Sequence, residues 1–250
     1  MNKNKLWLLA IISITILGCA KPQSKMPIVS SASADEETKK QQMLVLDDYL
    51  NNYKNLQKVA SRIITSGSDM CGEKVSAYYG FDYWNNDSFS NTMLPPAQIK
   101  YNISQKFKIL HISPESPAAL SGLQPKDTLV SINNWTIPIG KGSKKLLKEK
   151  LDAVGQPYSP VQVVVLRNSI EQTIDITPVQ ACDFSVYLAP DDVKNAYADG
   201  KNIVIYKGMM DFFKTDEEVA LVFSHELAHN SMKHIDAKKK NATLGGLYTR

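Results

Sequence analysis

TDEEVALVFSHELAH, residues 215–229, is the stretch of this 250-residue sequence that decides the fold of its C-terminal part. Thr215 and Glu218 have the spacing of a capping box, in which each side chain accepts a hydrogen bond from the backbone amide of the other. A helix is therefore expected to begin here. The apolar run Val219–Phe223 that follows suits a helix buried on most sides. Two histidines and a glutamate come next, and burying such groups is costly unless something pairs them.

The three polar residues His225, Glu226 and His229 form an HExxH motif. Residues four apart share a helix face, so His225 and His229 can ligate one zinc ion while Glu226 faces the bound water. Zinc lowers the pKa of that water to about 7, and Glu226 can take its proton as general base. The motif predicts peptide hydrolysis with one Zn²⁺ per complete domain. The alternative is an amphipathic helix with incidental histidines.

A third zinc ligand is not visible in the sequence. His234 lies five residues after His229, which turns it about 140° from the ligand face at helical pitch, so we expect it not to be a ligand. No glutamate follows Glu226. Because a catalytic zinc site takes three protein ligands and a water, two ligands leave this site incomplete.

The C-terminal motifs carry a resemblance. Asn195–Gly200, then Ile203–Met210, then the capped helix with HELAHN occur in an order similar to that of the zinc-metallopeptidase family of the heat-shock protease HtpX and the CAAX prenyl protease. The resemblance covers roughly residues 181–250 and implies a gluzincin domain, with the two histidines as zinc ligands and the glutamate as catalytic base. The third ligand of that family is a glutamate on a later helix. It is therefore expected beyond Arg250, in a chain that is a fragment or, as the second interpretation, a degenerate and inactive relative.

The segment Asn202–Tyr206 is rich in β-branched and aromatic residues between two glycines, which predicts a short strand. In zinc peptidases of this kind, an edge strand beside the motif helix pairs with the extended substrate. Ile203, Val204 and Ile205 are therefore candidate substrate-binding residues. The alternative is an ordinary strand inside a sheet.

The N-terminus predicts export. Met1–Lys5 is a short basic segment, and the apolar run Leu6–Leu17 is too short for a comfortable membrane span. It leads into Gly18-Cys19, which resembles a bacterial lipobox, so Cys19 is expected to be lipidated and to anchor the protein to the membrane. A plain signal anchor is the alternative. The expected location is the periplasmic side of the bacterial cell envelope, and Ala20 favours the outer membrane.

Two further cysteines, Cys71 and Cys182, remain in a protein expected in an oxidising compartment. An even pair there indicates a possible disulfide, and two buried free thiols are the alternative. The formal net charge is +4, but no concentrated basic face with interleaved aromatic residues is present. We therefore expect no binding to nucleic acid. The oligomeric state is left open by the sequence.

Two segments precede residues 181–250, which we call the peptidase-like part. From about Glu37 to Ile64, apolar residues recur at helical spacing and predict one long helix that packs on the domains that follow. The region after it contains short strands and turns. Lys108–Ile112 is expected as a strand, and Val161–Leu166 as a strand that pairs with Thr173–Thr177 across a turn.

Within this region Ser113–Asp127 resembles the most recognisable stretch of a bacterial PDZ domain, in which Ser-Pro begins a short helix between two strands. Lys126 stands where that family has glycine, which puts the shape of the turn in question. The resemblance implies that a helix at Lys144–Val154 flanks a groove into which a peptide adds as a β-strand. Tyr79–Phe81 would supply a carboxylate-binding loop. A small β domain of another kind is the alternative.

These observations predict an α+β chain with an N-terminal helix, a PDZ-like small β domain and the first part of a mainly helical gluzincin metallopeptidase domain. The expected boundaries are 1–19 for a lipoprotein signal peptide, 20–36 for a tether, 37–75 for the helical region, 76–180 for the PDZ-like domain and 181–250 for the metallopeptidase domain. The expected function is a membrane-tethered zinc metalloendopeptidase whose substrates are unfolded or misassembled envelope polypeptides. The alternative is a catalytically inert periplasmic chaperone or assembly factor that binds peptides through the PDZ-like domain.

Overall fold

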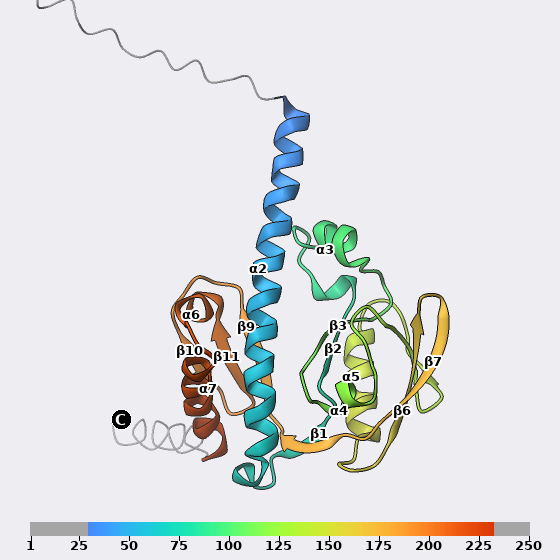
Figure 1. The fold of residues 1–250 in the computed structure, drawn as a ribbon, viewed down its shortest axis with the longest axis vertical. Coiled ribbons are helices and arrows are strands. Elements are labelled where there is room, and N and C mark those ends of the chain that lie inside the picture. The colour runs from blue at the N-terminus through green and yellow to red at the C-terminus, as the bar shows by residue number, and fades with distance from the viewer. Residues whose placement is uncertain (1–29, 233–250) are drawn as a thin grey trace, which may run out of the picture. The chain divides into compact units, whose positions relative to one another are not determined.

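The computed structural model describes residues 30–232 (Figure 1). The chain is of the α+β class, as predicted, with helices and mostly antiparallel sheets. Its internal contacts divide it after Thr38 into two units. The first unit contributes only the beginning of the first described helix, and the second unit holds every other element described below.

The elements are α2 (Ser31–Ser66), η1 (Ser68–Cys71), β1 (Val75–Tyr78), β2 (Phe81–Trp84), η2 (Asn86–Ser88), α3 (Leu94–Tyr101), β3 (Lys108–Ile112), α4 (Pro117–Leu120), β4 (Thr128–Ile132), β5 (Trp135–Thr136), α5 (Ser143–Val154), β6 (Val161–Arg167), β7 (Ile170–Ile176), β8 (Val179–Cys182), β9 (Ser185–Ala189), β10 (Ala196–Ala198), β11 (Asn202–Tyr206), α6 (Lys207–Phe212) and α7 (Asp216–Ser231).

Helix α2 begins earlier than its apolar periodicity predicts. It starts at Ser31 rather than near Glu37, inside the segment 20–36 that was expected to be a tether. The hydroxyl of Ser30 accepts from the amide of Ser33 at 3.1 Å, as the side chain of a helix N-cap does. Ala, Glu and Lys, which follow, are good helix formers even where no apolar stripe marks the helix.

The C-terminal half of α2 packs against the peptidase-like part, as predicted. One hydrophobic cluster joins α2 with strands β9 and β11 and helix α7, and Leu56, Ala60, Ile203, Ile205 and Phe223 in it are 0% exposed. Each large apolar side chain buried in this way contributes about 1.5–3 kcal/mol. The helix and the peptidase-like part therefore share one core.

The PDZ-like domain, defined here as the elements β2 to β7, has a core of its own. Its sheet has the order β2-β3-β4-β6-β7, with β5 paired to β4. Strand β3 has the predicted bounds, and β6 pairs with β7 in an antiparallel hairpin, as expected. The turn residues Asn168 and Ser169 have φ of 52° and 66°, which a type I′ hairpin turn requires.

Lys126 has a left-handed backbone conformation at the position where the resemblance placed glycine. Helix α4 begins as predicted, with the Ser116 side chain accepting from the amide of Ala119. Lys126 has φ of 80°, the left-handed conformation that glycine adopts easily. Lysine adopts it at a cost of about 1–2 kcal/mol, so the turn is strained at Lys126.

A two-stranded ribbon connects the PDZ-like domain to the rest of the chain. Strand β1 leads into the domain and β8 leads out of it, and the two are antiparallel partners with Val75 opposite Cys182. At the base of this ribbon Cys71 and Cys182 are joined in a disulfide, with Cα atoms 5.6 Å apart. The PDZ-like domain is therefore inserted between α2 and the peptidase-like part, and the disulfide closes its point of insertion.

The predictions for Cys19 and for His234 concern positions outside the described residues. Among residues 30–232, no helix is both long enough and apolar enough to cross a membrane. The lipid anchor at Cys19 stays a prediction.

Candidate metal centre

Helix α7 carries the candidate site and begins as the sequence predicts. The Thr215 hydroxyl accepts from the amide of Glu218, and the Glu218 carboxylate accepts from the amide of Thr215, each at 3.3 Å. Acidic residues fill the first turn, where the helix dipole favours them. Hydrogen bonds from its own backbone amide and from Thr215 lower the pKa of Glu217.

The two histidines of the motif point at one another. Their Nε2 atoms are 3.1 Å apart, and their rings are perpendicular with centroids 4.6 Å apart. Two ligands on one tetrahedral zinc ion at about 2.0–2.1 Å lie about 3.3 Å from each other. The separation of the two Nε2 atoms is therefore close to what a shared zinc ion requires, and the residues fit this metal.

Glu226 lies between the two histidines in the sequence and is only 9% exposed, whereas His225 is exposed. Among residues 30–232, no group of three or more His, Cys, Asp or Glu side chains is placed to hold a metal ion. The part of the chain that the structure describes thus contains two candidate ligands and the candidate base.

The remaining described histidine, His111, differs from the two motif histidines in being buried. It is buried in β3, and its Nε2 lies 3.5 Å from the Ser113 hydroxyl. Burial lowers the pKa of His111 to about 4. It is a neutral histidine of the PDZ-like domain rather than a candidate metal ligand.

Asn230, directly after the second histidine, holds the neighbouring hairpin in place. It is 1% exposed, its Oδ1 accepts from the amide of Gly200 at 2.7 Å, and its Nδ2 donates to the carbonyl of Asn202 at 3.0 Å. These two bonds attach the turn between β10 and β11 to the last turn of α7. Our sequence analysis gave Asn230 no role, although its position directly after the second histidine of the motif could have indicated one.

We expect Asn230→Ala to lower the free energy of unfolding by about 1–2 kcal/mol, because the half-buried amide of Gly200 loses its partner and the carbonyl of Asn202 keeps only the amide of Asp199 as a donor. Urea denaturation measures the change. Ser231→Ala is the matched control: within residues 30–232, the Ser231 hydroxyl donates to the carbonyl of Ala228 in the same helix and to no other element. Its effect is expected to stay within about 0.5 kcal/mol. Equal losses for the two variants would contradict the proposed role of Asn230.

The structure corrects the placement of the candidate substrate strand. Residues 202–206 do form a strand, β11, but it is the middle strand of the order β10-β11-β9. Its backbone groups pair with both neighbours, and Ile203 and Ile205 are 0% exposed while Val204 is 9% exposed. These three residues are core residues. Among the described strands, β10 and β9 form the two edges of this sheet.

Residues 160–242 match the family model of peptidase family M48. No curated protein matches the chain. Among solved structures, the chain is similar to the HtrA-type protease AlgW with decapeptide, at 14% identity and a TM-score of 0.31, over 42% of this chain and 30% of that one. The serine endoprotease from Yersinia pestis is similar at 18% identity and a TM-score of 0.30, over 46% of this chain and 36% of that one.

A structure of an isolated domain is also similar. It is the HtrA3 PDZ domain bound to a phage-derived ligand (FGRWV), at 16% identity and a TM-score of 0.31, over 43% of this chain and 88% of that one. The description of β2 to β7 as PDZ-like nevertheless rests on the strand order and helices of this chain. The match to family M48 covers the two histidines and the glutamate on α7, and it supports a peptidase in the C-terminal part of the chain.

Proposed function

We propose that the protein is a zinc metalloendopeptidase whose PDZ-like domain engages polypeptides. The observation that carries the proposal is the pair of Nε2 atoms 3.1 Å apart on α7, with Glu226 between the two histidines in the sequence. The match of residues 160–242 to peptidase family M48 supports it. When bound, zinc would polarise the scissile carbonyl and make water acidic enough to attack at neutral pH.

In this proposal each residue of the motif has one role. His225 and His229 would hold the metal through their Nε2 atoms, and a third ligand would come from outside residues 30–232. Glu226 would accept a proton from the attacking water and deliver it to the leaving nitrogen. All three residues lie on the one helix α7, whose backbone fixes the position of the base relative to the two ligands.

The edge of the sheet beside α7 is the place where an extended substrate would pair. Helix α7 lies against both β10 and β11, and β10 has a strand partner on only one side among the described residues. The main-chain groups of Ala196 and Ala198 point away from β11 and are therefore available to a substrate strand. We assign the pairing role, first expected for β11, to this edge.

The cellular setting forms part of the proposal. A lipid on Cys19 would tether the protein to a membrane on the periplasmic side, with the outer membrane favoured, and its substrates would be unfolded or misassembled envelope polypeptides. The second candidate function is a peptide-binding chaperone or assembly factor without catalysis. It is favoured by the presence of only two metal ligands among the described residues.

We expect His225→Ala and His229→Ala each to weaken zinc binding to the protein by at least about tenfold, because each removes one ligand. Competition with a chromogenic zinc chelator measures the affinity. His234→Ala is the control, since His234 is expected to lie off the ligand face, and it should leave the affinity unchanged. Zinc binding that survives loss of either motif histidine would overturn the ligand assignment.

A further inference from the structure

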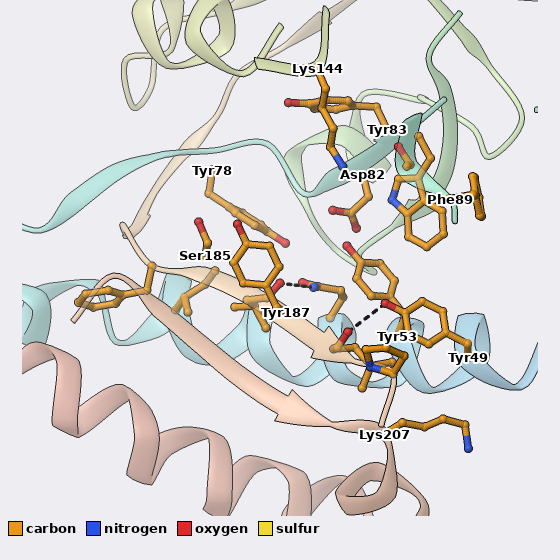
Figure 2. Close-up of a pocket in the computed structure, with 18 of the residues that line it drawn as sticks. Tyr49, Tyr53, Tyr78, Asp82, Tyr83, Phe89, Lys144, Ser185, Tyr187 and Lys207 are labelled. Atoms are coloured by element: carbon orange, nitrogen blue, oxygen red, sulfur yellow. Dashed lines mark hydrogen bonds between the residues drawn. The ribbon is translucent and has the colours of Figure 1, made fainter. Parts of the chain in front are cut away.

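A cleft with a volume of about 640 Å³ lies along α2, between strand β2 of the PDZ-like domain and strand β9 of the three-stranded sheet (Figure 2). Among the described residues, its lining includes Asp82, Tyr83 and Trp84 of β2 and no residue of α7. It therefore borders the peptide groove that the PDZ resemblance already implies, and it does not reach the candidate metal centre. A contact that does reach the end of α7 comes from the base of the ribbon formed by β1 and β8, beside the disulfide.

This contact is made by Lys74, which lies directly before β1 and three residues after Cys71. Its amine donates to the carbonyl of Asn230 in the last turn of α7 and to the carbonyl of Gly200 in the turn between β10 and β11, each at 3.4 Å. The amine also lies 5.5 Å from the centre of the Phe184 ring, within the range of a cation–π interaction. The side chain thus joins the base of the ribbon to the end of the helix that carries the motif.

Lys74, Gly200 and Asn230 form a closed set of hydrogen bonds. Gly200 donates its amide to the Asn230 side chain at 2.7 Å and accepts from Lys74 through its carbonyl. The carbonyl of Asn230 accepts from the same amine. A lysine amine has three donors, so one side chain can serve both carbonyls at once. Without Lys74 the side-chain bonds of Asn230 remain, but the last turn of α7 loses this attachment to the ribbon.

The charge of Lys74 suits its position. Helix α7 ends at Ser231, so the carbonyl of Asn230 belongs to its last turn. The last carbonyls of a helix carry the negative end of the helix dipole, and a cation there is stabilising. An uncharged side chain of similar length would fill the same space but would supply neither the charge nor the donors.

The backbone of Lys74 is held on both sides. Its amide donates to the carbonyl of Cys71 at 3.0 Å, and its carbonyl accepts from the amide of Asp183 at 2.8 Å. Cys71 is in turn bonded to Cys182, which directly precedes Asp183. The Phe184 ring beside the amine is 6% exposed and belongs to the core that α2 shares with the peptidase-like part. The amine therefore projects from a rigid base, as a group that positions another must.

The residue that Lys74 holds directly follows a candidate zinc ligand. His229 and Asn230 are consecutive in the last turn of α7, whereas His225 lies one turn earlier. A metal site requires its ligands to stay within about 0.5 Å of the productive geometry. Helix ends fray, and fraying of this turn would move His229 relative to His225. Attachment of the last turn therefore bears directly on the separation of the two Nε2 atoms.

We propose that Lys74 is a positioning residue for the candidate metal centre, which keeps His229 in register with His225 by tying the last turn of α7 to the disulfide-bonded base of the ribbon. In this role it touches neither the metal nor the substrate. The inference rests on the proposed function, because it takes the two histidines to be zinc ligands. It adds a residue that lies outside the segment 160–242 matched by peptidase family M48.

The first test needs no metal. Amide hydrogen exchange of the metal-free full chain, followed by NMR, reports local opening of the last turn of α7. Lys74→Met removes the charge and the donors but keeps a long unbranched side chain. Exchange at residues 229–232 is expected to become at least about tenfold faster, the effect of losing charge-assisted hydrogen bonds. Exchange at residues 220–224, earlier in the helix, should not change. Unaltered exchange at residues 229–232 would overturn the proposal.

The second test is zinc affinity, measured by competition with a chromogenic chelator. Lys74→Met should weaken zinc binding by about tenfold, as the loss of an outer partner of a metal site does. Lys74→Arg should stay within about threefold of the unsubstituted protein, because a guanidinium is also a cation that donates to carbonyls. Zinc affinity that is the same in Lys74→Met and in the unsubstituted protein would refute the positioning role.

Lys201→Met is the matched control. Lys201 follows Gly200 in the same turn and is exposed, and within residues 30–232 its side chain makes no hydrogen bond or ion pair. This variant should change neither exchange at residues 229–232 nor zinc affinity. The thermal unfolding midpoint of Lys74→Met should stay within about 4 °C of that of the unsubstituted protein. A larger fall with faster exchange throughout α7 would show that Lys74 supports the whole fold, and would overturn the specific role.

The two tests separate failure of this inference from failure of the proposed function. If zinc binding needs His225 and His229 but does not respond to Lys74→Met, the metal assignment stands and the positioning role is refuted. If zinc binding survives loss of either histidine, the metal assignment fails and the positioning role fails with it. Hydrogen exchange then still shows whether Lys74 holds the end of α7.

Discussion

Replacing Glu226 with glutamine is expected to reduce peptide cleavage by the intact protein by about 10²–10⁴-fold, the contribution of a positioned general base. Glutamine keeps the size and most of the hydrogen bonding of glutamate but cannot accept the proton of the attacking water. Because Glu226 is 9% exposed, a side chain of equal volume is needed to keep α7 packed. Cleavage of casein, followed by released fluorescent fragments, measures the rate.

The control is Glu217→Gln, the same change on an exposed residue in the first turn of α7. Its cleavage rate should stay within about threefold of the unsubstituted protein, because a surface change of this kind costs little. Zinc content should be the same in both variants, since neither removes a metal ligand. Undiminished cleavage by Glu226→Gln would show that the motif glutamate is not the base, even if zinc remains bound.

Removing the disulfide is expected to lower the free energy of unfolding by about 4 kcal/mol. The bond between Cys71 and Cys182 closes a loop with a sequence separation of 111 residues, and a cross-link over a long loop restricts the unfolded chain strongly. Both cysteines are buried, at 4% and 3% exposure, so alanine is the suitable replacement for each. Urea denaturation of Cys71→Ala/Cys182→Ala against the unsubstituted protein measures the loss.

Reduction supplies the control for this second prediction. A reductant should destabilise the unsubstituted protein by a similar amount and should leave the double variant unchanged, because only the former has the bond to lose. The loop contains the whole PDZ-like domain, so the strands β1 and β8 at its ends should separate more readily without the cross-link. A double variant as stable as the unsubstituted protein would show that the ribbon alone holds the two ends together.

The elements that were predicted well are those whose stabilising contacts are local. The capping box at Thr215 and Glu218 sets the start of α7, and the hairpin of β6 and β7 follows from two strand-forming runs around a two-residue turn. The start of α2 was missed because the signal used was apolar periodicity, which is absent from its first turns. Ser30 caps the helix there through a hydrogen bond to its side chain. One serine in a serine-rich segment is not enough to predict such a cap.

The candidate substrate strand shows where local reasoning ends. The composition of residues 202–206 predicts a strand, and the strand is present. Whether a strand is central or at an edge depends on which other segments pair with it. Here β9, which precedes β10 in the chain, pairs with β11 in parallel. Strand β11 therefore has a partner on each side and lies in the middle of the sheet rather than at its edge.

The sequence by itself determined the candidate metal-binding pair, since two histidines four residues apart on a helix must share a face, and their Nε2 atoms lie 3.1 Å apart. It also determined the helix that carries them and most of the PDZ-like strands. Only the tertiary structure decided that Cys71 lies beside Cys182, that Asn230 bonds to the hairpin turn, and that β2 and β9 face one cleft along α2. Helix caps, turns and periodic apolar faces depend on interactions within one segment of the chain. These contacts join segments separated by tens of residues, so they form only when the hydrophobic cores have packed.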